Sequence, residues 1–259
     1  MLIIDKKILN FNIKEVHFSD YPEDIKGCDF LNFKYCKNKV NIKGFTCKKE
    51  FTLIIDLTQD LDKIWQCMGN KSVRYRINRA QREGIKIYKN TSYEEFFQLY
   101  RSFIQKKGLK SLFDVFGVGS ITLESMKKYG TLFVAEYNSE ILAGTIFLED
   151  DVNIKAWIGV SKRFDSDRTK VLRTSEADRL IDWEVIKYAK EKGIKEYDLG
   201  GLWSKEEEEK DKQKKGINSY KLELGGKIVT NYSYQKFYSK KFLLVYQLYN
   251  LKNLGKVEN

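Results

Sequence analysis

Histidine is nearly absent from this sequence. The 259 residues include a single histidine, His17, and only four cysteines, Cys28, Cys36, Cys47 and Cys67. The cysteines show no CxxC spacing and have no histidines near them, which argues against a zinc site and against a disulfide framework. His17 lies in a segment without a recognisable nucleophile motif, so the sequence also argues against a histidine-dependent catalytic triad. We assign His17 a structural or surface role and expect a reduced cytoplasmic protein.

Proline and long apolar runs are also scarce. Pro22 is the only proline, so element boundaries must be read from glycine, charge and periodicity. No run approaches the roughly 18 apolar residues of a membrane span, and MLIIDKK lacks the basic start and apolar core of a signal peptide. A hydrophobic content of 42% with 14% aromatics indicates a folded globular protein with a sizeable core.

Positive charge is in excess, with a formal net charge of +11. Such a charge attracts polyanions such as tRNA, anionic lipid or phosphorylated substrates. The chain is also rich in Lys, Asn, Ile and Tyr together, all of which A/T-rich codons encode. Charge alone therefore does not separate a functional surface from codon bias.

Periodicity predicts the elements of the first half. A buried strand is expected at 51–57 and an amphipathic helix at 59–83, followed by a strand at 85–89. The next helix is expected to begin near Ser92, where Glu95 follows at capping-box spacing, and to end at Gly108.

The second half of the sequence predicts three consecutive strands followed by a long helix. A hairpin is predicted from strands at 131–137 and 141–149, then a strand at 153–162 and a long helix at 171–192 that Gly193 ends. Strands at 194–201 and 228–237 and an apolar-aromatic helix at 240–254 complete the order. The charged run EEEEKDKQKK, 206–215, is expected to form a solvated flexible loop, which could also serve as a lid. This order predicts an α+β protein with a mixed sheet flanked by helices, and it resembles the acyltransferase core of the GNAT type.

The most distinctive basic element is KSVRYRINRAQREGIKI, residues 71–87. On a helix, Val73, Ile77 and Ala80 form one buried stripe, and arginines including Arg74 and Arg76 line its flanks. Arginine offers a planar fork for phosphate oxygens, so this face is a candidate phosphate-binding surface. The alternative is an ordinary solvated helix face.

A second basic segment, SDRTKVLRTSEADRL, lies where a strand hands over to the long helix. A CoA pyrophosphate would bind there on backbone N–H groups at the helix N-terminus, which needs glycines for close approach. No glycine occurs between Gly159 and Gly193. Arg168 and Arg173 supply charge for a phosphate, but the glycine signature of a CoA site is missing.

Two paired glycines mark a candidate transfer site. YDLGG ends in Gly200 and Gly201, and SYKLELGG ends in a second pair; both segments read as strand-like runs. A strand that ends in paired glycines leaves room for a substrate against its backbone. Asp198 could accept a proton from an amine nucleophile, and Lys221 could stabilise an oxyanion or hold a phosphate. Ordinary turn glycines beside a surface lysine are the alternative.

Taken together, these segments resemble the Fem family, the peptidyltransferases that build peptidoglycan cross-bridges, and their GNAT-fold relatives. The resemblance rests on RYRINRAxxxG, FVAEYNSEILAGTIFLED, WIGVS, IDWEVIKYAKEKGIKEYDLGG and YKLELGGKIV. It implies a tandem GNAT-like architecture, aminoacyl-tRNA as donor and a lipid- or nucleotide-linked amine as acceptor. It also implies that Lys221 of the Tyr220-Lys221 pair supports the transition state, with Tyr220 packing the substrate.

On this basis we expect a degenerate N-terminal GNAT-like half at 1–90, a transferase domain at 91–240, and a C-terminal helix and tail at 241–259. The expected reaction forms an amide on a primary amine of a cell-envelope precursor, a peptidoglycan peptide or an amino sugar, without a tightly bound cofactor. Two alternatives stay open. One is acyl-CoA as the donor; the other is a non-catalytic basic module that binds tRNA or contacts the anionic inner face of a membrane through 240–254. For that helix, packing on the sheet is the favoured interpretation.

Overall fold

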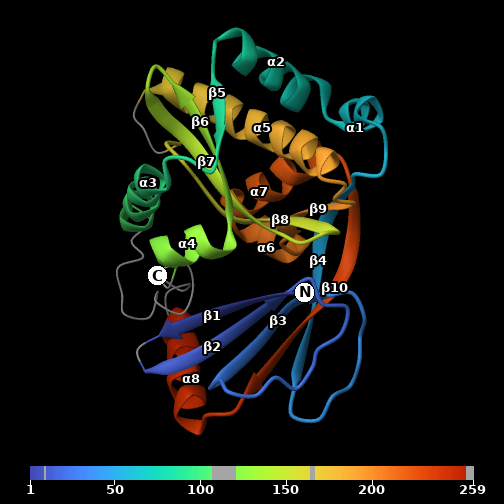
Figure 1. Ribbon diagram of the computed structural model, residues 1–259, viewed down its shortest axis with the longest axis vertical. Helices are drawn as coiled ribbons and strands as arrows, with labels where there is room; N and C mark the ends of the chain where they lie inside the picture. Colours follow the sequence, from blue (N-terminus) through green and yellow to red (C-terminus); the bar gives the residue numbers. More distant parts are fainter. Residues whose placement is uncertain (9, 107–120, 164–166, 255–259) are drawn as a thin grey trace. The chain divides into compact units, whose positions relative to one another are not determined.

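The computed structural model describes residues 1–8, 10–106, 121–163 and 167–254 (Figure 1). Its strands are β1 (Leu2–Ile8), β2 (Phe11–His17), β3 (Phe30–Cys36), β4 (Thr46–Asp56), β5 (Lys86–Lys89), β6 (Thr131–Tyr137), β7 (Glu140–Glu149), β8 (Asn153–Ser161), β9 (Glu196–Gly201) and β10 (Lys227–Phe237). Its helices are α1 (Leu61–Cys67), the π-helical turn η1 (Asn70–Arg74), α2 (Tyr75–Arg82), α3 (Tyr93–Lys106), α4 (Leu123–Tyr129), α5 (Arg168–Glu191), α6 (Lys205–Lys210), α7 (Lys212–Glu223) and α8 (Lys240–Leu254).

The described chain divides into two compact units. Unit 1 takes in residues 1–50 and 230–254, and unit 2 takes in residues 51–106 and 121–229. This division differs from the expected boundaries at 90 and 240, because β5 pairs with β6 and α2 packs along α5. The segment 51–90 therefore belongs with the expected transferase domain. That the N-terminal half is a degenerate GNAT copy stays a prediction.

Unit 2 is built on a mixed sheet with the strand order β4-β9-β8-β7-β6-β5. Only the β8–β9 pair is parallel; the four other pairs are antiparallel. Side chains of α1, α2 and α5 pack in one hydrophobic cluster on this sheet, and those of α3 and α4 pack in another. The expected α+β fold, a mixed sheet flanked by helices, is confirmed.

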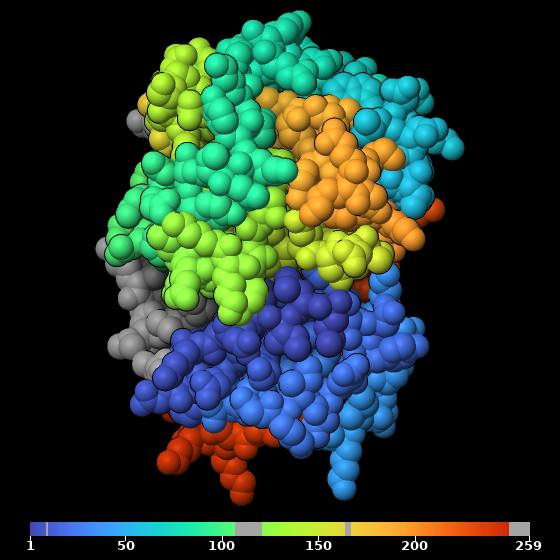
Figure 2. Space-filling view, in the orientation of Figure 1, coloured from blue at the N-terminus to red at the C-terminus, as the bar shows by residue number. Residues whose placement is uncertain are grey.

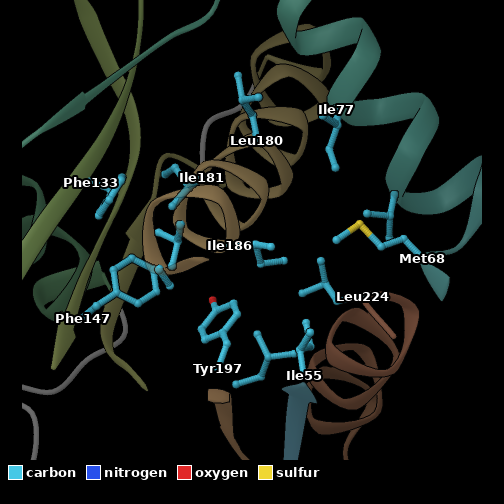
Figure 3. Close-up of a cluster of buried hydrophobic side chains, with 14 of the residues drawn as sticks. Ile55, Met68, Ile77, Phe133, Phe147, Leu180, Ile181, Ile186, Tyr197 and Leu224 are labelled. Carbon is cyan, nitrogen blue, oxygen red and sulfur yellow. The ribbon is translucent and has the colours of Figure 1, made fainter. Parts of the chain in front are cut away.

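The larger cluster lies between α5 and the sheet. Figure 3 shows Tyr197 of β9 among Phe147, Ile55 and Ile186, all of which are buried. On the outer side of α5, Ile77 faces Leu180, and the atoms of α2 lie beside those of α5 in the space-filling view (Figure 2). The predicted stripe of Val73, Ile77 and Ala80 is thus the buried face of this segment, with each residue 0% exposed.

Unit 1 has the strand order β1-β2-β3-β10, with β2 and β3 parallel and the other pairs antiparallel. Helix α8 packs on this sheet through Phe242, whose ring centroid lies 5.3 Å from that of Phe30 and 5.2 Å from that of Phe11. The favoured packing of this helix on the sheet is therefore confirmed. No helix in the described part of the chain is both long enough and apolar enough to cross a membrane.

Three predictions about local structure are wrong. The single helix expected at 59–83 is interrupted at Gly69, whose N–H donates to the Glu223 carbonyl at 2.8 Å and so pins the chain to a distant segment. The flexible loop expected at 206–215, and the strand expected before the second glycine pair, are the helices α6 and α7. A capping box between Ser204 and Glu207 begins α6, and the Asp211 side chain caps α7. The other predicted strands and helices lie within about five residues of their predicted bounds, except that the end expected at Gly108 falls outside the described residues. Strands β1, β2 and β3 and helix α4 were not predicted.

Gly226, in the turn between α7 and β10, gives a test of this packing. Its φ is +112°, and a Cβ there would lie 2.7 Å from the Ile54 carbonyl oxygen. We expect Gly226→Ala to lower the free energy of unfolding by about 2 kcal/mol or more. Gly216→Ala is the matched control, because Gly216 is helical and a Cβ there would meet nothing within 4 Å. That change should stabilise the protein by about 0.5–1 kcal/mol. Urea unfolding of both variants checks the pair, and a tolerated Gly226→Ala would contradict the described turn.

Candidate active site

A cavity of about 560 Å³ opens in unit 2 between the sheet and helices α5 and α7. Strands β7, β8 and β9 form its floor, and α5 and α7 form its walls. The residues that line it are Thr145, Ala156, Trp157, Gly159, Val160, Arg163, Asp178, Asp182, Tyr197, Leu199, Gln213, Gly216, Ile217, Tyr220 and Lys221.

The cavity exists because the sheet splits between β8 and β9. The two strands pair only from Asn153 to Lys155 on one side and from Glu196 to Asp198 on the other. Just beyond, β8 carries a bulge at Trp157, since Ile158 and Ala156 oppose consecutive residues of β7. A bulge bends its strand and re-aims the neighbouring side chains. An open space therefore lies where a continuous sheet would place a neighbouring strand, and β8 lines it with Ala156, Trp157, Gly159 and Val160.

Lys221 extends from α7 into this space. Its Nζ donates a hydrogen bond to the Gly201 carbonyl at 2.6 Å. Burial lowers the pKa of the Lys221 amine to about 8; the charge of Asp198 opposes this shift and that of Lys155 adds to it. The amine is therefore protonated at neutral pH, yet closer to releasing its proton than an exposed lysine.

The first glycine pair, Gly200 and Gly201, lies next to the Lys221 amine. Gly200 has φ +82°, and a Cβ there would lie 3.6 Å from Lys221 Nζ. Gly201 supplies the accepting carbonyl. The two glycines thus contact the lysine and do not line the cavity, and substrate binding by their backbone stays a prediction.

Asp198 has partners within the protein. It forms an ion pair with Lys155, its register partner on β8, and both side chains are largely buried. Its Oδ1 also accepts a hydrogen bond from the Gly200 N–H at 2.7 Å. Asp198 is not among the residues that line the cavity. The structure therefore places it behind Lys221, and its role as a proton acceptor stays a prediction.

Tyr220 closes the cavity next to Lys221 and is held from three sides. Its hydroxyl donates to the buried carboxylate of Asp182, which also accepts a hydrogen bond from Tyr197 at 2.8 Å. The Arg179 guanidinium lies 3.7 Å from the centroid of the Tyr220 ring and donates to the Tyr220 carbonyl at 2.8 Å. Burial raises the pKa of Asp182, although the Tyr220 hydroxyl and the charge of Arg179 oppose the shift.

The sequence analysis missed Asp178, which lies one helical turn before Asp182 on α5 and lines the same cavity. Burial raises the pKa of the Asp178 carboxyl to about 7; the charge of Asp182 adds to this shift, and that of Arg163 opposes it. The signal that could have found it is a pair of carboxylates at i and i+4 on a helix face that otherwise carries core residues. The sequence analysis considered only the positive charges of residues 166–180 and therefore did not consider this carboxylate pair.

The four arginines predicted to bind phosphates lie elsewhere. Arg76 donates to Ser175 of α5, and Arg173 forms an ion pair with Glu83 at 3.2 Å while its guanidinium lies 4.1 Å from the centroid of the Tyr137 ring. These two residues join α2 to α5. Arg74 is part of η1, and Arg168 is exposed at the first turn of α5. None of the four lines the cavity, and phosphate binding by them stays a prediction.

The N-terminus of α5 is occupied by the protein's own carboxylate. The Asp167 side chain accepts hydrogen bonds from the N–H groups of Thr169, at 2.8 Å, and Lys170, at 3.4 Å. A pyrophosphate that bound to these same amides would have to displace that carboxylate and its charge.

The sequence over residues 70–222, which includes every cavity-lining residue, matches the family described as "Acetyltransferase (GNAT) domain". Among curated proteins, no sequence match is found. The crystal structure of FemX superposes with a TM-score of 0.61 at 10% identity, over 95% of this chain and 85% of that one.

Two further solved structures share the fold. The C-terminal domain of a putative lysylphosphatidylglycerol synthetase from Agrobacterium fabrum has a TM-score of 0.55 at 12% identity, over 80% of this chain and 67% of its own. L-PGS from Bacillus licheniformis has a TM-score of 0.52 at 14% identity, over 86% of this chain and 72% of its own. The Fem and GNAT resemblance of the sequence is thereby confirmed at the level of fold.

The lowered pKa of Lys221 predicts how the free energy of unfolding depends on pH. The pKa of its amine is 10.5 in the unfolded reference and about 8 in the folded protein. Between these values the unfolded chain binds more protons, so the free energy of unfolding should rise with pH across this window, by up to about 3 kcal/mol. Lys221→Met should lack this rise. Lys215→Met, which removes an exposed lysine from the same helix, should keep it. Urea unfolding from pH 7 to 10.5 compares the three proteins, and an unchanged rise in Lys221→Met would contradict the buried amine.

Proposed function

Because the chain belongs to the GNAT acetyltransferase domain family, we propose that it transfers an aminoacyl or acyl group to a primary amine of a cell-envelope precursor, with aminoacyl-tRNA as the donor. The observation that carries this proposal is Lys221, a part-buried amine at the wall of a cavity that opens where the sheet splits. The cavity volume of about 560 Å³ is in the range of small-molecule sites.

The chemistry asked of such a site is modest. A neutral amine attacks the carbonyl carbon of an activated ester, and the tetrahedral intermediate carries a negative oxygen before the ester oxygen leaves. The Lys221 ammonium can stabilise that oxyanion or give its proton to the departing oxygen, and burial strengthens either interaction. No covalent enzyme intermediate is needed, because positioning of the two substrates supplies much of the rate.

Two observations support aminoacyl-tRNA over acyl-CoA. The Asp167 carboxylate occupies the α5 amides, and no glycine lies between Gly159 and Gly193 to let a pyrophosphate approach. The net charge of +11 also suits a polyanionic donor. The structural similarity to FemX and to a lysylphosphatidylglycerol synthetase domain is consistent with this donor class, while the acetyltransferase description of the family favours acyl-CoA as the second candidate.

An envelope acceptor would bring the protein to the inner face of the membrane. In unit 1, Leu244 and Leu248 of α8 are 58% and 53% exposed, and they follow Lys240 and Lys241. A helix with exposed leucines after two lysines suits peripheral contact with anionic lipid. This contact is part of the proposal and does not bear on the chemistry in unit 2.

The donor is tested by thermal unfolding with CoA, acetyl-CoA, charged tRNA and uncharged tRNA, each titrated separately. A ligand that binds only the folded state raises Tm in a saturable way. We expect a larger shift with charged than with uncharged tRNA, and one that survives moderate salt. A shift with CoA compounds alone would replace tRNA by acyl-CoA. Equal shifts with both tRNAs, abolished by salt, would indicate only non-specific charge.

Catalysis is tested with radiolabelled aminoacyl-tRNA and an extract of envelope precursors as acceptor, measuring a base-stable, amide-linked product. Lys221→Met should reduce the rate about 10²–10³-fold, since it removes a buried group that stabilises transition-state charge. Lys215→Met, on the exposed side of the same helix, should leave the rate unchanged. Full activity in Lys221→Met would overturn the role of this lysine.

A further inference from the structure

Two carboxylates face the cavity from one side of α5. Asp178 and Asp182 are four residues apart, which places them one above the other on the same helix face, and both line the cavity. A carboxylate taken out of water is costly unless hydrogen bonds or opposite charge compensate it. The hydrogen bonds and opposite charges around each carboxylate therefore indicate which of the two is available to bind a ligand.

Asp182 is compensated by the protein itself. The hydroxyls of Tyr197 and Tyr220 both donate to it, one to each carboxylate oxygen. These two tyrosines come from β9 and α7, so the carboxylate also ties the floor of the cavity to its wall. Both carboxylate oxygens of Asp182 therefore already accept a hydrogen bond from the protein, and a substrate would compete with a tyrosine hydroxyl for either of them.

Asp178 is less well compensated. The groups that act on it are Arg163 and Ser161 at the end of β8, Asp182 and Arg179 on its own helix, and Tyr220, with Lys221 beside it, on α7. Arg163 is exposed, and its guanidinium lies 5.5 Å from the centroid of the Phe103 ring, so water screens its charge. Burial and the charge of Asp182 prevail and raise the pKa of Asp178 to about 7.

From this placement we propose that Asp178 binds the primary ammonium group of the acceptor substrate in the cavity and accepts its proton before the amine attacks. The inference rests on the proposed function and names the acceptor class, a primary amine that arrives protonated. An ammonium group placed beside Asp178 adds its positive charge to those of the exposed Arg163 and of Lys221, which line the same cavity. It also brings the proton donor within hydrogen-bonding reach of a carboxylate that is poised to take the proton near neutral pH.

The atoms balance without any further reagent. The ammonium gives one proton to Asp178, and the neutral amine forms the new N–C bond at the ester carbonyl. The C–O bond of the donor then breaks; its oxygen takes a proton from the Lys221 ammonium, and the nitrogen loses its second proton to the neutral lysine. Asp178 returns its proton to water. One ester and one ammonium thus give one amide, one alcohol and one released proton.

Ammonium recognition is tested apart from transfer, using n-butylammonium chloride as the probe and n-butanol as its uncharged counterpart. In thermal unfolding at pH 8, above the Asp178 pKa of about 7, we expect a saturable rise in Tm with n-butylammonium and none with n-butanol. Asp178→Asn should weaken the affinity at least about tenfold, whereas Asp151→Asn, which removes an exposed carboxylate elsewhere in unit 2, should not. Equal affinity in Asp178→Asn, or no saturable rise in the unmodified protein, would overturn the proposal.

A second measurement needs no variant, in case Asp178→Asn does not fold. The affinity of the unmodified protein for n-butylammonium should fall as the pH is lowered through about 7, because Asp178 then becomes neutral. A flat affinity between pH 5 and 8 would contradict the assignment.

The proton step is tested in the transfer assay. Asp178→Asn should lower kcat about 10²–10⁴-fold and remove the acid limb of the pH–rate profile, which a purely structural role would leave in place. Undiminished transfer with an unchanged profile would refute the role of Asp178 and leave the proposed function standing. Absence of transfer by the unmodified protein would refute the proposed function and the proton step, while the n-butylammonium titration would still decide ammonium recognition.

Discussion

The candidate site depends on one buried ion pair, Lys155 with Asp198, at the last paired position of the parallel strands β8 and β9. Up to this pair the sheet is continuous, and beyond it the cavity begins. Removing one partner of a buried ion pair leaves an uncompensated charge and typically costs about 3–5 kcal/mol. The pair therefore fixes where the sheet splits. It also sets the electrostatic surroundings of Lys221, because the charges of both partners act on the pKa of that amine.

Helix α7 is held to its neighbours by polar contacts of its last residue, Glu223. The Arg179 guanidinium donates to Glu223 at 2.8 Å, and the Glu223 carbonyl accepts from Gly69 at 2.8 Å. The turn that carries Tyr220 and Lys221 is thus bound to α5 and to the start of η1 at once. Catalytic groups on rigid elements keep their geometry better than groups on mobile loops. The same contact explains why the helix expected at 59–83 is interrupted. The Gly69 N–H donates its hydrogen bond to α7 instead of to a carbonyl of its own helix.

Local sequence patterns predicted most helices and strands of unit 2. The remaining features depend on contacts between residues far apart in the sequence. The apolar runs of β6 and β7 on either side of the turn at Asn138, and the apolar period of α5, specify these elements by themselves, so they were predicted correctly. Helices α6 and α7 were misread because their density of charge was given more weight than the high helix propensity of Glu and Lys. The capping signature of Ser204 and Glu207 was present in the sequence. No local pattern, in contrast, shows that Gly69 meets Glu223, or that Asp178 faces Lys221 across a cavity, because both depend on how α5 and α7 pack.

The same physical cause shifts two groups in this cavity in opposite directions on the pH scale. Burial lowers the pKa of Lys221 to about 8 and raises that of Asp178 to about 7, so each is moved from an extreme value toward neutrality. Both shifts work against the folded state, because the cavity disfavours the charged form of each group. A protein selected only for stability would remove such groups or pair them directly, as it has paired Lys155 with Asp198. Groups that can give and take protons near pH 7, facing one cavity from two different helices, are what proton transfer to and from an amine requires.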